Sequence, residues 1–215
     1  QTCALPIWNA AGALWGLAFD ADSRKAIRKN GGIDKLIQCL GSGDIELKLN
    51  AARALRNLAV DADSRKAIRD KRGIDKLIQC LGSRDIELKR NAAGALLELA
   101  LYTVSRKSIR ESGGIDKLIQ CLDSDNDELK RNAAGALCRL ALDADSRTAI
   151  RDNEGIPKLI ECLDSNNDEL KRNAAAALVY LALDADSRTA IRDNEGIPKL
   201  IKCLDSDNAI LDPEE

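Results

Sequence analysis

The chain has 215 residues, and 33 Lys and Arg residues against 35 Asp and Glu residues give it a formal net charge of −2. A protein that binds nucleic acid through the phosphates usually carries a basic excess, so this balance argues against nucleic acid as the main partner. The chain has no histidine, which is the commonest general base and the commonest zinc ligand. No apolar run approaches the ~18–20 residues of a membrane span, so we expect no membrane partner.

The first seven residues stand apart from the rest of the chain. Residues 1–7 resemble the translation of a common sequencing adapter, and we expect them to be foreign to the protein, which would make the chain a fragment. No charged segment followed by an apolar one is present there, so no secretory signal is predicted.

From residue 8 onward the sequence repeats itself every 41 residues. The motif Asn-Ala-Ala begins at positions 9, 50, 91, 132 and 173, and Ile-Xaa-Lys-Leu-Ile begins at 33, 74, 115, 156 and 197. A fixed period of this length is typical of solenoids and other repeat folds. We therefore predict one repeat domain over residues 8–208, followed by an irregular tail over 209–215.

Each repeat is predicted to contain three helices. In the first full copy the longest helix spans about residues 44–60, where apolar side chains from Leu47 to Leu58 recur at helical spacing. A short helix over 64–69 follows Asp-Ala-Asp-Ser, whose side chains are candidate N-caps. Gly73 is predicted to end it, because glycine accepts a positive φ, and an apolar helix then begins at once.

These three-helix units resemble the armadillo repeat family. The resemblance is carried by the length of the unit, by the glycine between its short first helix and apolar second helix, and by the motif Asn-Ala-Ala-Arg-Ala-Leu-Arg-Asn-Leu-Ala at 50–59, which is similar to the family's third helix. It covers essentially all of 8–208 and implies an all-α fold, a right-handed α-solenoid (superhelix) of armadillo-like repeats. HEAT repeats, which usually have two helices, are the alternative.

The resemblance implies that the third helices line a concave groove. Between the copies in this chain the framework barely changes, whereas the positions of Arg53, Arg56 and Asn57 vary freely; the variable sets include Trp15 and Gly94. These three positions share one helix face. We interpret them as a face that recognises a ligand, with sequence drift at exposed positions as the alternative.

One position on this face is constant, because asparagine recurs there in every copy. An Asn amide can both donate to and accept from a peptide unit, so a row of them could hold an extended chain by its backbone; the alternative is that they bond neighbouring helices. The candidate peptide-binding residues are Asn50, Asn91, Asn132, Asn173, Arg53, Arg56, Asn57, Arg90, Glu98, Arg131, Arg139 and Tyr180.

The groove departs from importin-α-like members of the family. Their tryptophan positions hold Gly12, Arg53, Gly94, Gly135 and Ala176 here, so nuclear localisation signals are not the expected ligand. The groove candidates lean basic, which is closer to the β-catenin-like case of acidic extended segments, because guanidinium forks suit carboxylates. The mid-helix glycines either leave room for a ligand backbone or are relics of repeat duplication.

The expected function is non-catalytic binding of a protein or extended peptide, and the alternative is a structural spacer or self-assembling repeat element. The chain has no Gly-rich phosphate loop and no nucleophile motif, so we expect no enzyme activity, cofactor or metal. Neither end has an obvious polar cap, which predicts end-to-end self-association through the terminal repeats.

Two further sets of residues follow the period. Five of the seven cysteines recur at 41 residues, and stacked repeats hold equivalent positions ~8–10 Å apart, too far for a disulfide, so we predict buried thiols in the reducing cytoplasm or nucleus. A row of arginines on the short helix is predicted to form surface ion pairs with repeated aspartates, the alternative being a phosphate-binding stripe; its members are Arg28, Arg69, Arg110, Arg151 and Arg192.

Overall fold

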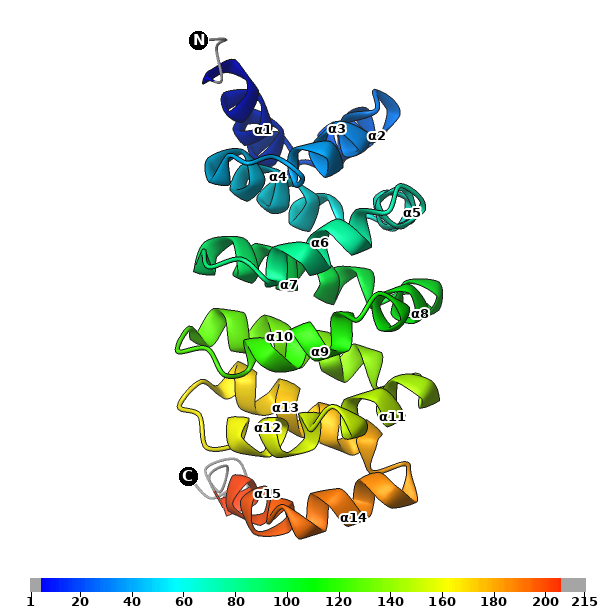
Figure 1. The fold of residues 1–215 in the computed structure, drawn as a ribbon, viewed down its shortest axis with the longest axis vertical. Helices are drawn as coiled ribbons and strands as arrows, with labels where there is room; N and C mark the ends of the chain where they lie inside the picture. Colours follow the sequence, from blue (N-terminus) through cyan, green and yellow to red (C-terminus); the bar gives the residue numbers. More distant parts are fainter. Residues whose placement is uncertain (1–4, 206–215) are drawn as a thin grey trace, which may run out of the picture.

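The computed structural model describes residues 5–205, and this part of the chain forms fifteen α-helices and no strand. Figure 1 shows them stacked along one long axis. In chain order they are α1 (Leu5–Leu17), α2 (Ala21–Lys29), α3 (Gly32–Cys39), α4 (Ile45–Leu58), α5 (Ala62–Asp70), α6 (Gly73–Leu81), α7 (Ile86–Leu99), α8 (Thr103–Glu111), α9 (Gly114–Cys121), α10 (Asp127–Leu140), α11 (Ala144–Asp152), α12 (Gly155–Cys162), α13 (Asp168–Leu181), α14 (Ala185–Asp193) and α15 (Gly196–Asp205).

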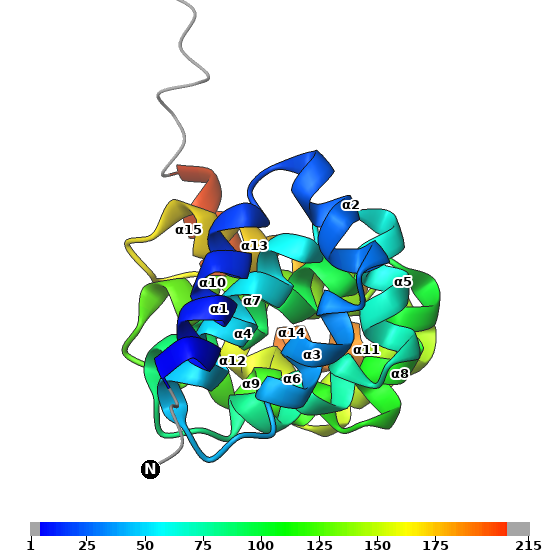
Figure 2. The same cartoon turned by 90° about the horizontal axis from the view of Figure 1, so that it is seen from above.

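The stack confirms the prediction of an all-α solenoid of three-helix repeats. The third helices α1, α4, α7, α10 and α13 pack against one another along the whole stack and form its most extensive contacts. Seen from above, they gather on one side, whereas the first helices α2, α5, α8 and α11 lie along the opposite edge (Figure 2). Helix α1 begins at Leu5 and so crosses the expected boundary at residue 8, and the predicted tail over 209–215 lies outside the described residues.

The helix boundaries follow from the caps that the sequence supplies. The carboxylate of Asp44 accepts a hydrogen bond from the backbone N–H of Leu47 at 3.0 Å, so the third helix begins one residue after it. Asp61 caps α5 in the same way through Ser64, at 2.9 Å. The end of the third helix is also held, because Arg65 of α5 donates to the carbonyl oxygens of Ala59 and Val60 just after α4. The bond to the residue that follows the third helix is repeated in every described copy.

Gly73 has a different role from the predicted one. Positive φ belongs to the residue before it, with φ 58° at Arg72 and 73° at Gly31 in the first copy. Gly73 itself is the first residue of α6, and a Cβ there would lie 2.8 Å from the carbonyl oxygen of Ile68. The glycine therefore recurs because the second helix begins in direct contact with the end of the first helix, and close approach decides the residue.

An apolar core runs continuously along the stack. Third helices contribute alanine and leucine, such as Ala51, Leu55 and Leu58, and second helices contribute isoleucine and leucine, such as Ile74 and Leu77; all are buried. Burial of apolar surface at about 25 cal/mol per Å² is the dominant favourable term for such a stack. Since each repeat covers its neighbours, the core holds the third helices at a fixed register and so fixes the face that is predicted to line the groove, which we call the groove face.

The predicted surface ion pairs form between successive first helices. Arg28 donates to Asp61 and Asp63 at 2.5 and 2.8 Å, and Arg110 and Arg151 reach the next repeat in the same way. Arg69 instead pairs with the adjacent Asp70. Exposed pairs of this kind contribute roughly 0–1 kcal/mol each, so they align the repeats more than they stabilise them.

The six cysteines that the structure describes are free thiols, and Cys3 lies outside the described residues. Burial raises the pKa of Cys80, Cys121 and Cys162 to about 11, which keeps these thiols protonated and unreactive at neutral pH. Within residues 5–205 no cluster of Cys, Asp and Glu side chains is arranged to hold a metal ion, and none of the helices has the length and apolarity to cross a bilayer.

Candidate functional site

An alternating row of arginine and glutamate side chains crosses the groove face of the third helices. We call it the ion-pair ladder. Arg53 contacts Glu87 at 3.5 Å. Arg90 contacts the same Glu87 and also contacts Glu128 at 2.5 Å. Arg131 contacts Glu128 at 3.4 Å and Glu169 at 2.9 Å. The ladder therefore joins α4, α7, α10 and α13, and most of the predicted groove arginines belong to it.

Glu128 is the central carboxylate of the ladder because three arginines contact it. They are Arg90, Arg131 and Arg56, whose guanidinium reaches Glu128 at 3.4 Å. Burial alone would raise the pKa of Glu128, but the charges and hydrogen bonds of Arg90 and Arg56 outweigh it and hold the pKa below its ordinary value of 4.5. Glu128 is therefore ionised at neutral pH and neutralises part of the basic charge of the groove.

Arg139 and Glu98 form a separate pair, with Arg139 Nη1 3.7 Å from Glu98 and 2.5 Å from the carbonyl oxygen of Leu97. These two residues occupy the same variable position in neighbouring copies of the repeat, and they pair with each other. Tyr180, at the same position in the last third helix, is half-buried against the core.

The constant asparagines bond to the protein's own backbone. The amides of Asn50, Asn132 and Asn173 donate to the preceding third helix, to the carbonyl oxygens of Trp8, Arg90 and Arg131 respectively, at 3.1–3.2 Å. Asn91 instead donates to Glu87 in its own helix at 2.7 Å. Asn91 and Asn132 are only 3% and 2% exposed. The structure thus contains the inter-helix bonds of the alternative interpretation, and contact with a ligand backbone stays a prediction.

The space beside the mid-helix glycines is filled by side chains. A Cβ on Gly94 would lie 2.7 Å from Nε and 2.9 Å from Cδ of Arg56, so the Arg56 side chain crosses α7 over this glycine. A Cβ on Gly135 would meet Asn173 and Leu97 at 3.1 Å. Gly94 is thereby explained: it lets an arginine of α4 reach past α7 to Glu128 on α10.

A pocket of about 390 Å³ opens on this face at its N-terminal end, and we call it the groove pocket. The guanidinium of Arg53 lies 4.9 Å from the centre of the Trp15 ring, in cation–π contact, and the ring of Phe19 contacts Trp15 with centroids 6.3 Å apart. The amide nitrogen of Asn57 is buried there without a hydrogen-bond partner. The pocket is lined by Trp15, Phe19, Arg53, Arg56, Asn57, Arg90 and Asn91, none of which is acidic.

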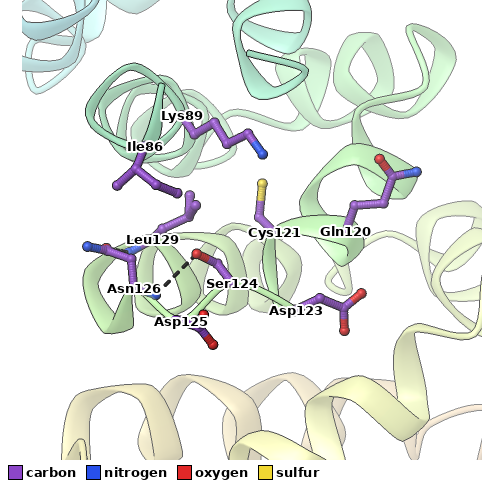
Figure 3. Close-up of a pocket in the computed structure, with 9 residues that line it drawn as sticks. All are labelled: Ile86, Lys89, Gln120, Cys121, Asp123, Ser124, Asp125, Asn126 and Leu129. Carbon is purple, nitrogen blue, oxygen red and sulfur yellow. Dashed lines mark hydrogen bonds between the residues drawn. The ribbon is translucent and has the colours of Figure 1, made fainter. Parts of the chain in front are cut away.

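A larger hollow of about 540 Å³ lies elsewhere, between the start of α7 and the loop after α9 (Figure 3). Figure 3 shows the amine of Lys89 and the sulfur of Cys121 directed into it, beside the loop that holds Ser124. A hollow of about 350 Å³ occurs one repeat earlier around the equivalent Lys48 and Cys80. Because it recurs with the repeat and its thiol is unreactive, this hollow follows from repeat geometry rather than from a specialised site.

The structure thus brings Arg53, Arg56, Asn57 and Arg90 together in the lining of the groove pocket. Arg90 and Arg131 make the closest ion pairs of the ladder. Sequence reasoning did not find Phe19, which follows α1 and carries no signal beyond being apolar. Trp15 belongs to the variable set, but the sequence does not show that its ring lies beneath Arg53 of the next third helix.

Comparison with known proteins places this fold in a family. The model for the Armadillo/beta-catenin-like repeat matches residues 20–60, 61–101, 105–142 and 143–183, which make up most of the chain. No curated protein matches the chain.

Several of the similar solved structures are engineered or designed proteins. One engineered protein is 35% identical, with 92% of this chain and 82% of that chain covered and a TM-score of 0.87. Another is 34% identical, with 94% and 50% covered and a TM-score of 0.90. A designed armadillo repeat protein in complex with the peptide (KR)4 is 18% identical, with 90% and 83% covered and a TM-score of 0.84. With four matched repeats in the family's own three-helix order, the chain belongs to the Armadillo/beta-catenin-like repeat family.

Proposed function

We propose that this chain is a non-catalytic scaffold that holds an extended segment of a partner protein along the groove of its third helices. The observation that carries the proposal is the groove pocket, where aromatic rings and guanidinium groups meet with no acidic side chain in the lining. The designed armadillo repeat protein with bound (KR)4 has the same fold, so this architecture is able to present a surface to a peptide.

The polarity of the pocket favours an acidic segment. Arg53, Arg56 and Arg90 line it, and guanidinium groups form strong, often bidentate hydrogen bonds to carboxylates and phosphates. The peptide (KR)4 in the designed relative has the opposite charge. Because all six described cysteines are free thiols, we also propose a reducing compartment, the cytoplasm or nucleus, as the place of action.

Fluorescence anisotropy tests the proposal directly. Labelled extended peptides rich in Glu are titrated with the chain, with glutamine versions and (KR)4 as controls. We expect saturable binding of the acidic peptides alone, together with a change in the emission of the two tryptophans, one of which lies in the pocket. If no extended peptide binds, the groove function is wrong and the spacer becomes the better account.

Self-assembly is the second candidate, because the last described helix leaves apolar side chains uncovered. Ile197 and Ile201 of α15 are 50% and 54% exposed, whereas their counterparts Ile156 and Ile160 in α12 are 1% and 2% exposed. We propose that the 215-residue chain associates end to end through this face. Sedimentation velocity should show oligomers that Ile201→Glu dissociates; a monomer at every concentration would exclude self-assembly.

A further inference from the structure

We propose that the groove pocket is the point at which an anionic side chain of the partner segment is bound, and that Arg53 and Arg56 bind it while Arg90 and Arg131 remain part of the scaffold. The inference rests on the proposed function and makes it specific. It names one pocket, two ligand-binding arginines and the chemical class of the group that they bind.

The ion-pair distances separate the arginines into two kinds. Arg90 makes the closest contacts of the ladder, bridging Glu87 and Glu128. Arg53 and Arg56 are held to the same two carboxylates at 3.5 and 3.4 Å only. Each of those carboxylates keeps the closer Arg90 when the other arginine leaves. A ligand can therefore take Arg53 and Arg56 without leaving a protein carboxylate unpaired, whereas removing Arg90 would break the ladder.

The pocket contains a hydrogen-bond donor that lacks an acceptor. The amide nitrogen of Asn57, which lines the pocket, is buried and has no hydrogen-bond partner within residues 5–205. A buried donor without an acceptor costs about 1–3 kcal/mol, which a ligand that supplies the acceptor would recover. Guanidinium groups and this amide surround the space, so a group with several acceptor oxygens fits it and a cation does not.

Two contacts already place the ligand-binding arginines. Trp15 supports the guanidinium of Arg53 from one side at 4.9 Å. Gly94 leaves space for the aliphatic part of Arg56, which crosses α7 at this point and would clash with any side chain there. Arginine stacked on an aromatic ring keeps its donor edge free for a planar anion. The aromatic wall formed by Trp15 and Phe19 leaves room for the apolar part of the same side chain.

The size of the pocket agrees with one side chain and its backbone, because about 390 Å³ lies within the roughly 300–1,000 Å³ typical of ligand pockets. The side chain that the pocket binds ends in an oxyanion. This oxyanion is either the carboxylate of Asp or Glu or the phosphate of a phosphorylated residue. A carboxylate can be bound by the planar guanidinium of one arginine. A phosphate accepts more hydrogen bonds, so its affinity gains more from both arginines and Asn57 together.

The test compares single charge-neutralising variants by peptide affinity. Arg53→Gln and Arg56→Gln each remove one ligand-binding arginine. Arg172→Gln is the matched control, because Arg172 lies on the third helix α13, outside the groove pocket, and has no ion pair within residues 5–205. All are titrated with a Glu-rich peptide, with the same peptide carrying one phosphoserine, and with a glutamine version. Circular dichroism melting checks that each variant is folded.

We expect about a tenfold loss of affinity for Arg53→Gln and for Arg56→Gln, the effect of one charged hydrogen bond, and less than about twofold for Arg172→Gln. A larger gain for the phosphoserine peptide that both variants abolish assigns the pocket to phosphate; equal affinity assigns it to carboxylate. If the parent binds but Arg172→Gln weakens binding as much as Arg56→Gln, the pocket assignment is wrong and the groove function stands. If the parent binds no peptide, the groove function itself fails.

Discussion

The middle of the groove and its N-terminal end use the same residue types for opposite purposes. In the middle, α7 and α10 carry Arg90 and Arg131 at equivalent positions, and Glu87 and Glu128, three residues earlier, complete the ladder. In α4 that position is Leu49, which is buried, so α4 joins the ladder only through Arg53 and Arg56. These two arginines are held at 3.5 and 3.4 Å, farther from their carboxylates than Arg90 is. Whether an arginine is structural or free to bind depends on which carboxylates its neighbours supply.

Glu128→Gln should have the largest effect on this contrast. It removes the one carboxylate that contacts Arg90, Arg131 and Arg56, and we expect a loss of about 1–2 kcal/mol in the free energy of unfolding. The same change releases Arg56, so acidic peptides should bind more tightly. Urea unfolding and anisotropy measure the two effects. Weaker peptide binding by this variant would mean that Arg56 needs Glu128 to be positioned.

Gly94→Ala should change the position of the Arg56 side chain without changing its charge. The new methyl group would lie 2.7 Å from Arg56 Nε, so Arg56 must leave its path over α7, and peptide affinity should change severalfold. The strain should cancel the stabilisation of about 1 kcal/mol expected from replacing a mid-helix glycine. Gly12→Ala is the matched control, because its Cβ meets Asn50 at an ordinary 3.5 Å and should stabilise the fold. Equal stabilisation by both would show that Arg56 moves at no cost.

Acid should weaken the ladder before it affects the core. Because the folded pKa of Glu128 is lowered, its contribution to stability is complete above its ordinary pKa of 4.5 and is lost as the pH falls through the lower folded value. Melting temperatures measured from pH 7 to about pH 3 should fall less for Glu128→Gln than for the parent. Parallel curves would show that other carboxylates dominate the acid response.

Salt should have the smallest effect on stability and a clear effect on binding. Raising the ionic strength from about 0.1 M to about 1 M shortens the Debye length from about 10 Å to about 3 Å. Peptide affinity should then fall, because the ligand is attracted by the partly exposed guanidinium groups of Arg53 and Arg56, while the apolar core leaves the melting temperature nearly unchanged. An affinity independent of salt would point to apolar contacts with Trp15 and Phe19 instead.

Local signals in the sequence were sufficient for the fold. The 41-residue period gave the repeats, and Asp-Ala-Asp-Ser placed the start of α5 to within two residues, because α5 begins at Ala62 after its N-cap Asp61 rather than at the predicted residue 64. The role of Gly73 could not be read in this way, since it depends on the distance to Ile68 after the two helices turn against each other. Sequence patterns report spacing along one helix and do not report approach between helices.

The candidate site was predicted only in part for the same reason. Arg53, Arg56 and Asn57 were found because their positions vary between copies. The partners of Asn50, Asn132 and Asn173 lie 42 residues away and that of Arg56 lies 72 residues away, so these bonds become visible only once the repeats are stacked. Residue type alone therefore does not separate Arg56, which reaches over a glycine, from Arg90, which closes the ladder.

The contact from Arg56 to Glu128 has a consequence for how the solenoid unfolds. Repeat stacks are usually treated as one-dimensional chains in which each unit is coupled only to its nearest neighbours. Here a side chain of α4 contacts α10 across α7, so three successive units share one interaction. Fraying from the N-terminal end should therefore stop before α4 and then proceed in one step through these units. A calorimetric unfolding block larger than a single repeat would be its signature.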